Sequence, residues 1–564
     1  MKRCFFYLGL AVMGIPIILF SAGLVAAGPK PDTFEWETVV NKNDKMPNAP
    51  PDAPPRSKTF NSFNQPSVNM SGVVVLRARS RGGMGQHTRG IYSRNMSNGD
   101  VPENSINTIA GGQMLVPFPN NLEATFIEFP SIPRIAIHAN AVATRGNHSP
   151  VWEFIPPGET ENTRAGTSGV YFHPNALSTG SALNTGSSKL GLVPEFSFFA
   201  VPGVPEGTIF DVFPGSPSIT DFLFIAFKGN YTELVGSNLL SKTGVFYRGL
   251  VAEPAGGSSP VELIANTDTL IPNLPNGVTG ITFGSTAPPS AAGDRMVFVG
   301  LDNEENPTVG GIYQAQLAQP PTLTTLVALG SKVPDEKGQT FTRLGEGLSY
   351  DGRFVAFWGA WGNDTNILWL DCPTEGNSER IQFCLEEVGD NFPVQVPLNQ
   401  GIFVYDTFTT KLRMVARTGD DFDDFVFWNF SGRVPGSQEE DDGEPARWRS
   451  SSFVSVSGRS GATFSAVFKA RNGEIDPTEN FYVDPIDGIY LNKGPGQVKG
   501  VTVLDTTMFG NTLDPEASPG SLITALGLER EGLRGKWLVI NASMGEEGAE
   551  EDASMAGIYL TEIP

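Results

Sequence analysis

The tripeptide Gly311-Ile312-Tyr313 is one of seven near-copies of the same short pattern along the chain. Each copy has a glycine, then a β-branched residue, then an aromatic residue, which is typical of a short β-strand. Neighbouring copies lie 67 to 90 residues apart, and this spacing indicates a repeat architecture. The other copies are Gly90-Ile91-Tyr92, Gly169-Val170-Tyr171, Gly244-Val245-Phe246, Gly401-Ile402-Phe403, Gly488-Ile489-Tyr490 and Gly557-Ile558-Tyr559.

The unit that ends at Gly401-Ile402-Phe403 shows the whole repeat. It contains four predicted strands, which we name D (323–328), A (341–349), B (353–358) and C (from 401), and turn residues separate them. The chain of 564 residues has 64 glycines and 44 prolines, and 18% of its residues are charged. This composition favours many short strands joined by turns and disfavours long helices.

One segment of this unit resembles a known family. The run Leu348-Ser-Tyr-Asp-Gly-Arg-Phe-Val-Ala-Phe357 resembles the repeat of TolB-type and related WD40-like propellers. The chain as a whole is similar to exported bacterial repeat proteins of β-propeller type. The resemblance implies a propeller fold and carries no functional residue with it.

The count of predicted strands decides how the ring closes. B strands are predicted also at 73–77, 135–139, 222–227, 296–301, 464–468 and 537–542, and D strands at 106–110, 196–201, 261–265, 412–416 and 501–505. There are seven B and seven C strands, but only six D strands follow the first C strand. We expect residues 34–40 to supply the seventh, because a propeller hides its edges when one chain end completes the blade of the other. The sequence therefore predicts an all-β, seven-bladed β-propeller, closed by an N-terminal strand in the C-terminal blade.

The first residues predict export. Lys2 and Arg3 precede an uncharged run that ends in small residues at Ala27, as in a secretory signal peptide spanning 1–27. The run is also long enough to remain as an uncleaved membrane anchor. Residues 28–33 are an extended leader, and the propeller occupies 34–564, with the closing strand in 34–47 and a proline-rich linker in 48–57. The expected location is the periplasm or the extracellular space.

After residue 27 the chain has two cysteines, Cys372 and Cys384. In an exported protein, a pair so close in sequence favours a disulfide that ties one long loop. The alternative is a two-cysteine metal site. It is disfavoured because no histidine or third cysteine is nearby.

The formal net charge of −22 disfavours nucleic acid and, beyond the signal segment, membranes as partners. We expect a monomer.

In a blade the B-to-C and D-to-A connections leave from the same end, and the long insertions fall in these two classes: 146–168, 359–400, 472–487, 543–556 and 418–449. This elaborated, acidic end is the predicted binding face.

Several residues on this face are candidates for ligand contacts. Asp420, Asp421, Asp423 and Asp424 form a predicted Ca²⁺ site, with plain solvation of the acidic loop as the alternative. Trp361 and Trp448 lie in polar loop sequence and are predicted surface rings for a glycan or peptide. His138 is expected to pack inside a B strand, while His87 and His148 are expected on adjacent loops.

No catalytic signature occurs: there is no Gly-x-Ser-x-Gly, His-Glu-x-x-His, Gly-Lys-Ser/Thr loop or Cys-x-x-Cys. The leading hypothesis is an exported, non-catalytic propeller that binds an unidentified protein or glycan. The alternative is a carbohydrate-active hydrolase or lyase with acidic residues at the axis. Two carboxylates facing each other within about 5 to 10 Å there would favour the enzyme.

Overall fold

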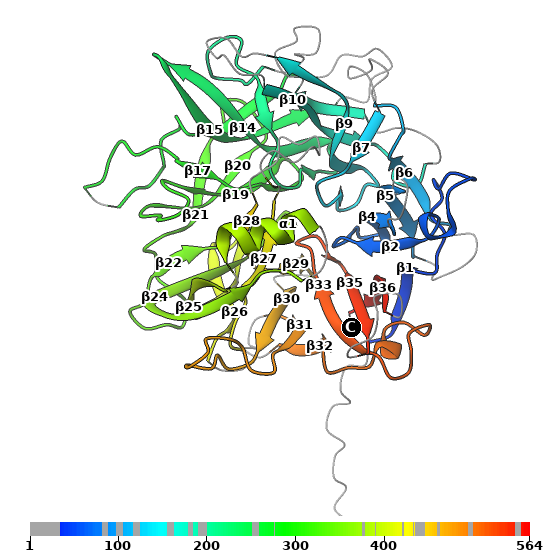
Figure 1. Ribbon diagram of the computed structural model, residues 1–564. Helices are drawn as coiled ribbons and strands as arrows, with labels where there is room; N and C mark the ends of the chain where they lie inside the picture. Colours follow the sequence, from blue (N-terminus) through cyan, green and yellow to red (C-terminus); the bar gives the residue numbers. More distant parts are fainter. Residues whose placement is uncertain are drawn as a thin grey trace, which may run out of the picture. The chain divides into compact units, whose positions relative to one another are not determined.

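Seven β-sheets surround a common axis in the computed structural model, and each sheet corresponds to one repeat of the sequence (Figure 1). The structure describes residues 34–563 except 82–87, 98–104, 117–124, 155–162, 179–183, 190–199, 251–258, 276, 375–377, 390, 420–421, 433, 435–445, 460–462, 495–499 and 547–553. The predicted signal peptide (1–27) and the predicted leader (28–33) therefore lie outside the described residues. The all-β, seven-bladed propeller is confirmed.

The strands run A, B, C and D outward from the axis. Blade 1 contains β2 (Phe60–Phe63), β3 (Ser67–Val68), β4 (Val73–Ser80), β5 (Arg89–Asn95) and β6 (Asn107–Gly111). Blade 2 contains β7 (Thr125–Glu128), β8 (Arg134–Ile135), β9 (Val142–Phe154), β10 (Thr163–His173) and β11 (Asn184–Lys189). Blade 3 contains β12 (Phe210–Val212), β13 (Ser218–Ile219), β14 (Phe224–Val235), β15 (Asn238–Gly249) and β16 (Glu262–Asn266). Blade 4 contains β17 (Ser285–Thr286), β18 (Ser290–Ala292), β19 (Arg295–Leu301), β20 (Gly310–Gln316) and β21 (Leu323–Ala328).

The remaining blades follow the same plan. Blade 5 contains β22 (Phe341–Leu344), β23 (Ser349–Tyr350), β24 (Phe354–Asp371), β25 (Asn391–Asp406) and β26 (Lys411–Arg417). Blade 6 contains β29 (Val454–Gly458), β30 (Phe464–Asn472), β31 (Ile486–Asn492) and β32 (Val501–Asp505). Blade 7 contains β33 (Leu522–Gly527), β34 (Leu533–Arg534), β35 (Trp537–Gly545), β36 (Met555–Glu562) and β1 (Trp36–Asn41). Outside the blades lie the hairpin β27 (Phe427–Ser431) and β28 (Arg447–Ser451), the α-helix α1 (Ser378–Phe383), the π-turn η3 (Cys384–Val388), and the 3₁₀ turns η1 (Pro55–Ser57) and η4 (Gly510–Thr512).

The A strand is broken into two short strands in every blade except the sixth, and both pieces pair with the B strand. The inner pieces β3, β8, β13, β18 and β23, then β29 and β34, contact one another in that order, and β34 contacts β3 again. These inner strands therefore line the axis as a closed ring.

Steric fit explains why the repeated tripeptide begins with glycine. In blade 4, Gly311 pairs across the sheet with Gly300, and the ring of Tyr313 meets the ring of Phe283 edge to face at 5.3 Å. A Cβ added to Gly311 would lie 2.2 Å from the Val327 carbonyl oxygen of the D strand, and one added to its partner Gly300 would lie 2.4 Å from the Phe283 ring. Five other blades have the same edge-to-face pair: Phe60–Tyr92, Phe126–Tyr171, Phe210–Phe246, Phe341–Phe403 and Phe422–Tyr490.

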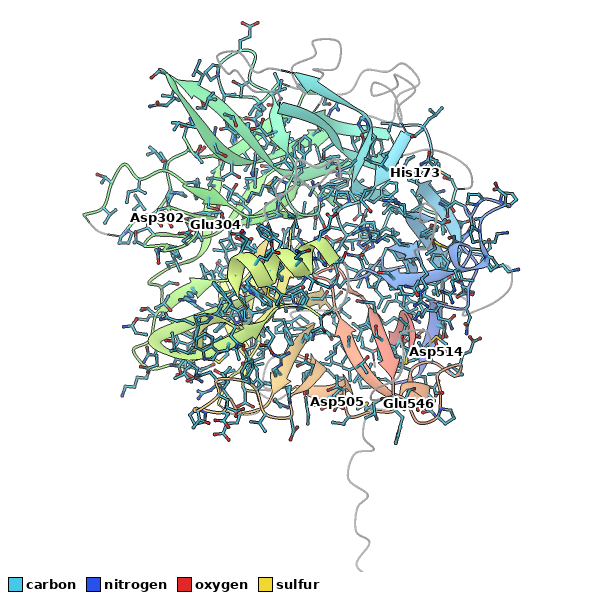
Figure 2. All side chains as sticks on the ribbon, viewed as in Figure 1. His173, Asp302, Glu304, Asp505, Asp514 and Glu546 are labelled. Carbon is cyan, nitrogen blue, oxygen red and sulfur yellow. A yellow bond between two sulfur atoms is a disulfide. The ribbon has the colours of Figure 1, made fainter. Side chains whose placement is uncertain are left out.

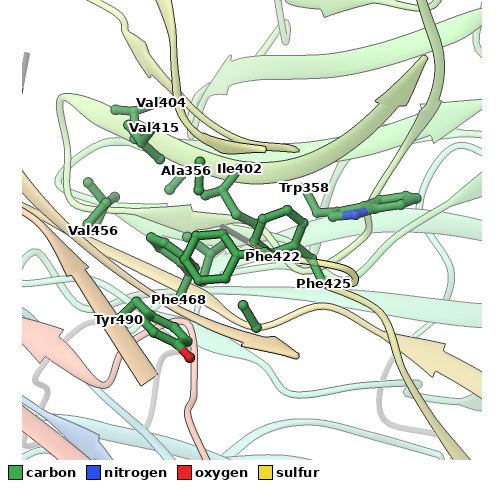
Figure 3. Close-up of a cluster of buried hydrophobic side chains, with 14 of the residues drawn as sticks. Ala356, Trp358, Ile402, Val404, Val415, Phe422, Phe425, Val456, Phe468 and Tyr490 are labelled. Atoms are coloured by element: carbon green, nitrogen blue, oxygen red, sulfur yellow. The ribbon is translucent and has the colours of Figure 1, made fainter. Parts of the chain in front are cut away.

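Neighbouring blades bury apolar side chains between them. Figure 3 shows the cluster between blades 5 and 6, in which Ala356, Ile402 and Val404 of one blade face Phe468 and Tyr490 of the next. Similar clusters fill the other gaps around the ring. Each blade thus needs both neighbours to bury its faces.

The N-terminal strand closes the ring as predicted. β1 pairs antiparallel with β36, with Trp36 opposite Thr561 and Asn41 opposite Gly557. Val39 and Val40 are fully buried, whereas Trp36 is only half-buried against the same blade. The two valines therefore contribute more to the closure than Trp36 does.

Three details of the strand assignment are corrected. Residues 135–139 are not a B strand: the chain turns after β8, and β9 is the B strand, because an apolar run does not by itself distinguish the two. The D strand of blade 2 is β11, a polar strand, while most of the predicted segment 196–201 lies outside the described residues. Residues 146–168 and 359–400 are largely continuations of strands and not loops.

No helix in the described ranges is long and apolar enough to cross a bilayer.

Removing the closing strand tests the ring. A chain that begins at Ser57 lacks the two buried valines, each worth about 2 kcal/mol of apolar burial, and leaves β36 as an open edge. We expect it to melt at a distinctly lower temperature or to aggregate, whereas a chain that begins at Gly28 stays intact. Equal melting temperatures of two monomeric proteins would contradict closure by β1.

A glycine substitution tests the repeat. A Cβ at Gly311 would lie 2.2 Å from the Val327 carbonyl oxygen, so Gly311→Ala must shift β20 away from β21. We expect the free energy of unfolding to fall by about 1 to 3 kcal/mol in urea titrations, as for other overpacked cores. The control is Gly545→Ala, where the nearest atom to the new methyl group is 3.7 Å away. If both variants unfold at the same urea concentration, the steric account of the repeat is wrong.

Candidate binding face

The B-to-C and D-to-A connections leave at one end of the ring, which we call the loop face; the A-to-B and C-to-D turns form the plain face. Two hairpins project furthest on the loop face. The pairing of β24 with β25 continues to Asp371 opposite Asn391, and that of β14 with β15 continues to Val235 opposite Asn238. The expected elaboration of one face is confirmed for the described residues, although strands provide much of it.

Exposed apolar side chains gather on this face. Of the 16 large hydrophobic residues that are exposed in the described part of the chain, three belong to plain-face turns: Met70, Phe222 and Phe408. The other 13 lie at the loop-face end of their blades: Leu115, Leu234, Val235, Leu239, Leu240, Leu270, Ile367, Leu385, Phe392, Leu398, Val483, Phe509 and Leu522. Eight of these belong to the two projecting hairpins and the residues between β24 and β25. Grouped exposed apolar side chains are typical of interaction sites.

The elements of blade 5 and the hairpin β27–β28 form a cap, which we define as residues 362–398 with β27 and β28. Figure 1 shows α1, β27 and β28 drawn over the centre of the ring. On the inner side of the cap, Leu368, Leu370, Val394 and Val396 pack against Trp428 and Trp448. The predicted disulfide between Cys372 and Cys384 is present and joins the end of β24 to η3. The cap is therefore a packed layer tied by a covalent bond.

Cations and aromatic rings attach the cap to blade 6. The ammonium of Lys469 lies 3.8 Å from the ring centre of Phe427, and the guanidinium of Arg471 lies 5.0 Å from the same centre. Asp487 accepts a hydrogen bond of 2.7 Å from Arg471 and is 3.7 Å from Lys469. Burial lowers the pKa of Lys469 to about 8. These contacts fix β27, so the cap has a defined position on the propeller.

At the axis, a segment of the last blade fills the space inside the ring. We call residues 528–535 the axial plug. Both of its carboxylates are buried and bond to one arginine of blade 2: Arg134 donates to Glu529 through Nη2 and to Glu531 through Nη1, the second bond measuring 3.3 Å. Ser218 of blade 3 also donates to Glu531 at 3.2 Å.

The axial plug reaches the other four blades through further hydrogen bonds. The Val68 N–H of blade 1 donates to the carbonyl of Glu531 at 3.2 Å, and Arg530 donates to the carbonyl of Pro288 in blade 4 at 3.1 Å. The hydroxyls of Ser349 in blade 5 and Ser455 in blade 6 donate to the carbonyl of Arg530 at 2.5 and 2.9 Å. One segment thus bonds to all six other blades.

The four aspartates of the predicted Ca²⁺ site are only partly described. Asp420 and Asp421 lie outside the described residues. Asp423 accepts a hydrogen bond from the Gly473 N–H at 2.9 Å, and the fully buried Asp424 accepts bonds from Val426 and from the Tyr482 hydroxyl. Burial raises the pKa of Asp424, and its contacts hold the segment before β27 against blade 6.

No group of three or more metal-ligating side chains occurs in the described ranges of the chain. Figure 2 shows Asp302 and Glu304 far from Asp505, Asp514 and Glu546 around the ring. The acidic runs 439–444 and 547–552 lie outside the described residues. The acidic side chains labelled in Figure 2 are therefore spread around the ring.

The candidate tryptophans take different positions from those expected. Trp361 is 3% exposed and meets the Phe403 ring at 6.1 Å, so its predicted surface position is corrected: polar neighbours in sequence did not reveal that β24 continues into the packed region. Trp448 is half-buried on the inner side of the cap, 5.5 Å from Phe430. Neither ring stands free on the loop face.

The histidines also differ from expectation. His138 is exposed on a plain-face turn, where its backbone N–H donates a hydrogen bond to the Asp221 carboxylate, so it is not packed in a strand. His148 is buried in β9, and His87 lies outside the described residues.

Sequence reasoning also missed the axial plug. Its signal is weak: the run Glu529-Arg530-Glu531 is charged just before the inner strand β34, whereas most of the other inner strands begin with a serine.

No family model and no curated protein matches this chain. Among solved structures, an oligogalacturonate lyase from Vibrio parahaemolyticus is 9% identical with a TM-score of 0.33, and the alignment covers 95% of this chain and 99% of that one. A levansucrase mutant from B. megaterium is 12% identical with a TM-score of 0.25, covering 62% and 82%. The β-propeller domain of Nup133 from Vanderwaltozyma polyspora is 8% identical with a TM-score of 0.23, covering 74% and 97%. These are distant structural neighbours, and no activity follows from them.

Removing the arginine that holds the axial plug should destabilise the whole ring. In Arg134→Met two buried carboxylates lose their hydrogen-bonded cation and keep only the longer contacts with Arg530 and Arg534, at 3.5 and 4.0 Å. Broken buried ion pairs cost about 3 to 5 kcal/mol, and we expect urea unfolding to show a loss of this size. The control, Arg295→Met, removes an exposed pair and should change little. An unchanged stability of Arg134→Met would show that the axial plug does not hold the blades.

Proposed function

We propose that this chain is an exported, non-catalytic binding propeller that holds a protein or glycan partner on its loop face. The observation that carries the proposal is the uneven distribution of exposed apolar side chains, 13 of 16 of which lie at this end of the blades. The cap and the hairpin β14–β15 raise these groups above the ring. The disulfide supports export, because such bonds persist in oxidising compartments.

The axis supports binding over catalysis. A glycosidase at this place would need two carboxylates that face a substrate. Glu529 and Glu531 are buried, and both bond to Arg134, so neither has an open side for a sugar. If the chain is instead a carbohydrate-active enzyme, its catalytic acids must be residues outside the axial plug.

The proposal is tested by probing glycan and protein arrays with the purified chain and with two loop-face variants. One variant carries Ile367→Asp and Leu398→Asp in the cap, and the other carries Leu234→Asp and Leu239→Asp in the hairpin β14–β15. All four side chains are at least 44% exposed, so the folded state should tolerate the change. We expect at least one variant to bind the recognised partner about 10-fold more weakly, since buried apolar anchors dominate interface energies.

The control is Phe408→Asp, which changes an 83% exposed ring on the plain face of blade 5. It should bind like the unchanged chain. Equal loss in all three variants would place the contact elsewhere. Release of sugar fragments from a bound glycan would overturn the non-catalytic part of the proposal and favour the enzyme.

A further inference from the structure

Three arginines of blade 1 surround one glutamate of blade 2 near the loop face. We call Arg77, Arg79 and Arg89 the arginine cluster. The carboxylate of Glu128 accepts a hydrogen bond of 2.9 Å from Arg77 and one of 3.1 Å from Arg89, and it lies 3.9 Å from the guanidinium of Arg79. Three positive charges therefore face one negative charge.

Repulsion among the three arginines makes this arrangement unfavourable if it serves only to join the two blades. Arg77 and Arg79 are two residues apart on β4 and so project from the same side of the sheet, and Arg79 lies directly opposite Arg89 on β5. Like charges at such positions repel each other. A blade-to-blade ion pair with Glu128 needs one arginine, so within the described part of the chain the other two have no carboxylate of their own. The cluster thus has an excess of positive charge, whereas the chain as a whole has a net charge of −22.

Two of these arginines also have N–H groups that make no hydrogen bond to Glu128. Arg77 is 9% exposed, yet its Nε is buried without a hydrogen-bond partner. Arg79 makes an ion pair but no hydrogen bond with Glu128, and its side chain is 44% exposed. Burial raises the pKa of Glu128, but the three guanidiniums outweigh it and lower the pKa to about 2, so the carboxylate is charged at neutral pH. The positive excess is thus the state of the site at pH 7.

We propose that the arginine cluster binds a doubly charged oxyanion, the sulfate or phosphate group of a small ligand or sugar ester, at the junction of blades 1 and 2. Guanidinium groups bind such oxygens through paired hydrogen bonds. The anion offsets the two surplus charges and takes up the unused donors. Arg79, as the most exposed member, forms the outer side of the site, and Arg77 forms its base. The site goes beyond the apolar contacts of the proposed function and does not depend on them.

The test measures binding of sodium sulfate and sodium phosphate to the full chain by isothermal titration calorimetry, at constant ionic strength set with sodium chloride. The esters glucose 6-sulfate and glucose 6-phosphate, titrated in parallel, distinguish a free anion from a sugar-borne one. The critical variant is Arg79→Gln, because that side chain makes no hydrogen bond to Glu128 and its loss leaves the other two contacts intact. We expect its affinity to fall about 10-fold or more, the usual effect of one charged hydrogen-bonding partner.

Two further variants keep the result unambiguous. Arg343→Gln removes an exposed arginine of β22 and should leave the affinity unchanged. Glu128→Gln removes the carboxylate that competes for these arginines, so it should tighten binding even though it lowers stability. Failure of all four probes to bind, equal weakening by Arg79→Gln and Arg343→Gln, or weaker binding by a folded Glu128→Gln chain would each overturn the proposal.

Discussion

The pairing of β1 with β36 joins the two ends of the described chain, and the ring of blades depends on it. Every blade has two apolar faces, and each needs a neighbour to cover it. A linear row of such sheets would leave two faces and two strand edges in water. Pairing across more than 500 residues removes these exposed ends at once, because the outermost strand of the last blade comes from the start of the chain.

The axial plug adds a second constraint inside the ring. Residues 528–535 bond to all six other blades, so the relative positions of the inner strands are set by one segment. Most of these bonds join side-chain hydroxyls or guanidiniums to carbonyls and carboxylates that are shielded from water. In such surroundings an unpaired polar group is costly, so the network favours a single arrangement. A filled axis leaves the variable connections as the place for function.

The loop face carries two chemically different features. The cap and the hairpin β14–β15 present apolar side chains, and the disulfide of Cys372 with Cys384 ties the cap, which would reduce the conformational freedom lost in the proposed binding. The arginine cluster, at the junction of blades 1 and 2, presents positive charge in an otherwise acidic protein. An apolar contact contributes affinity over a wide area, while a cluster of like charges selects for ligands of the opposite charge.

The fold was determined by local rules that the sequence displays. The glycine of Gly311-Ile312-Tyr313 is required by the backbone of the D strand beside it, where a Cβ would meet the Val327 carbonyl oxygen, and the tripeptide recurs in seven copies, so counting them predicts the blades and the missing strand. The short spacing of Cys372 and Cys384 likewise predicts their bond. The sites depend on contacts between distant parts of the chain: Ser218 meets Glu531, 313 positions further along. Polar sequence around Trp361 suggested a surface ring, but its burial depends on how far β24 continues and on what packs beside it. Backbone sterics act over a few residues and are therefore visible in the sequence, whereas burial and charge pairing are decided only when the blades meet.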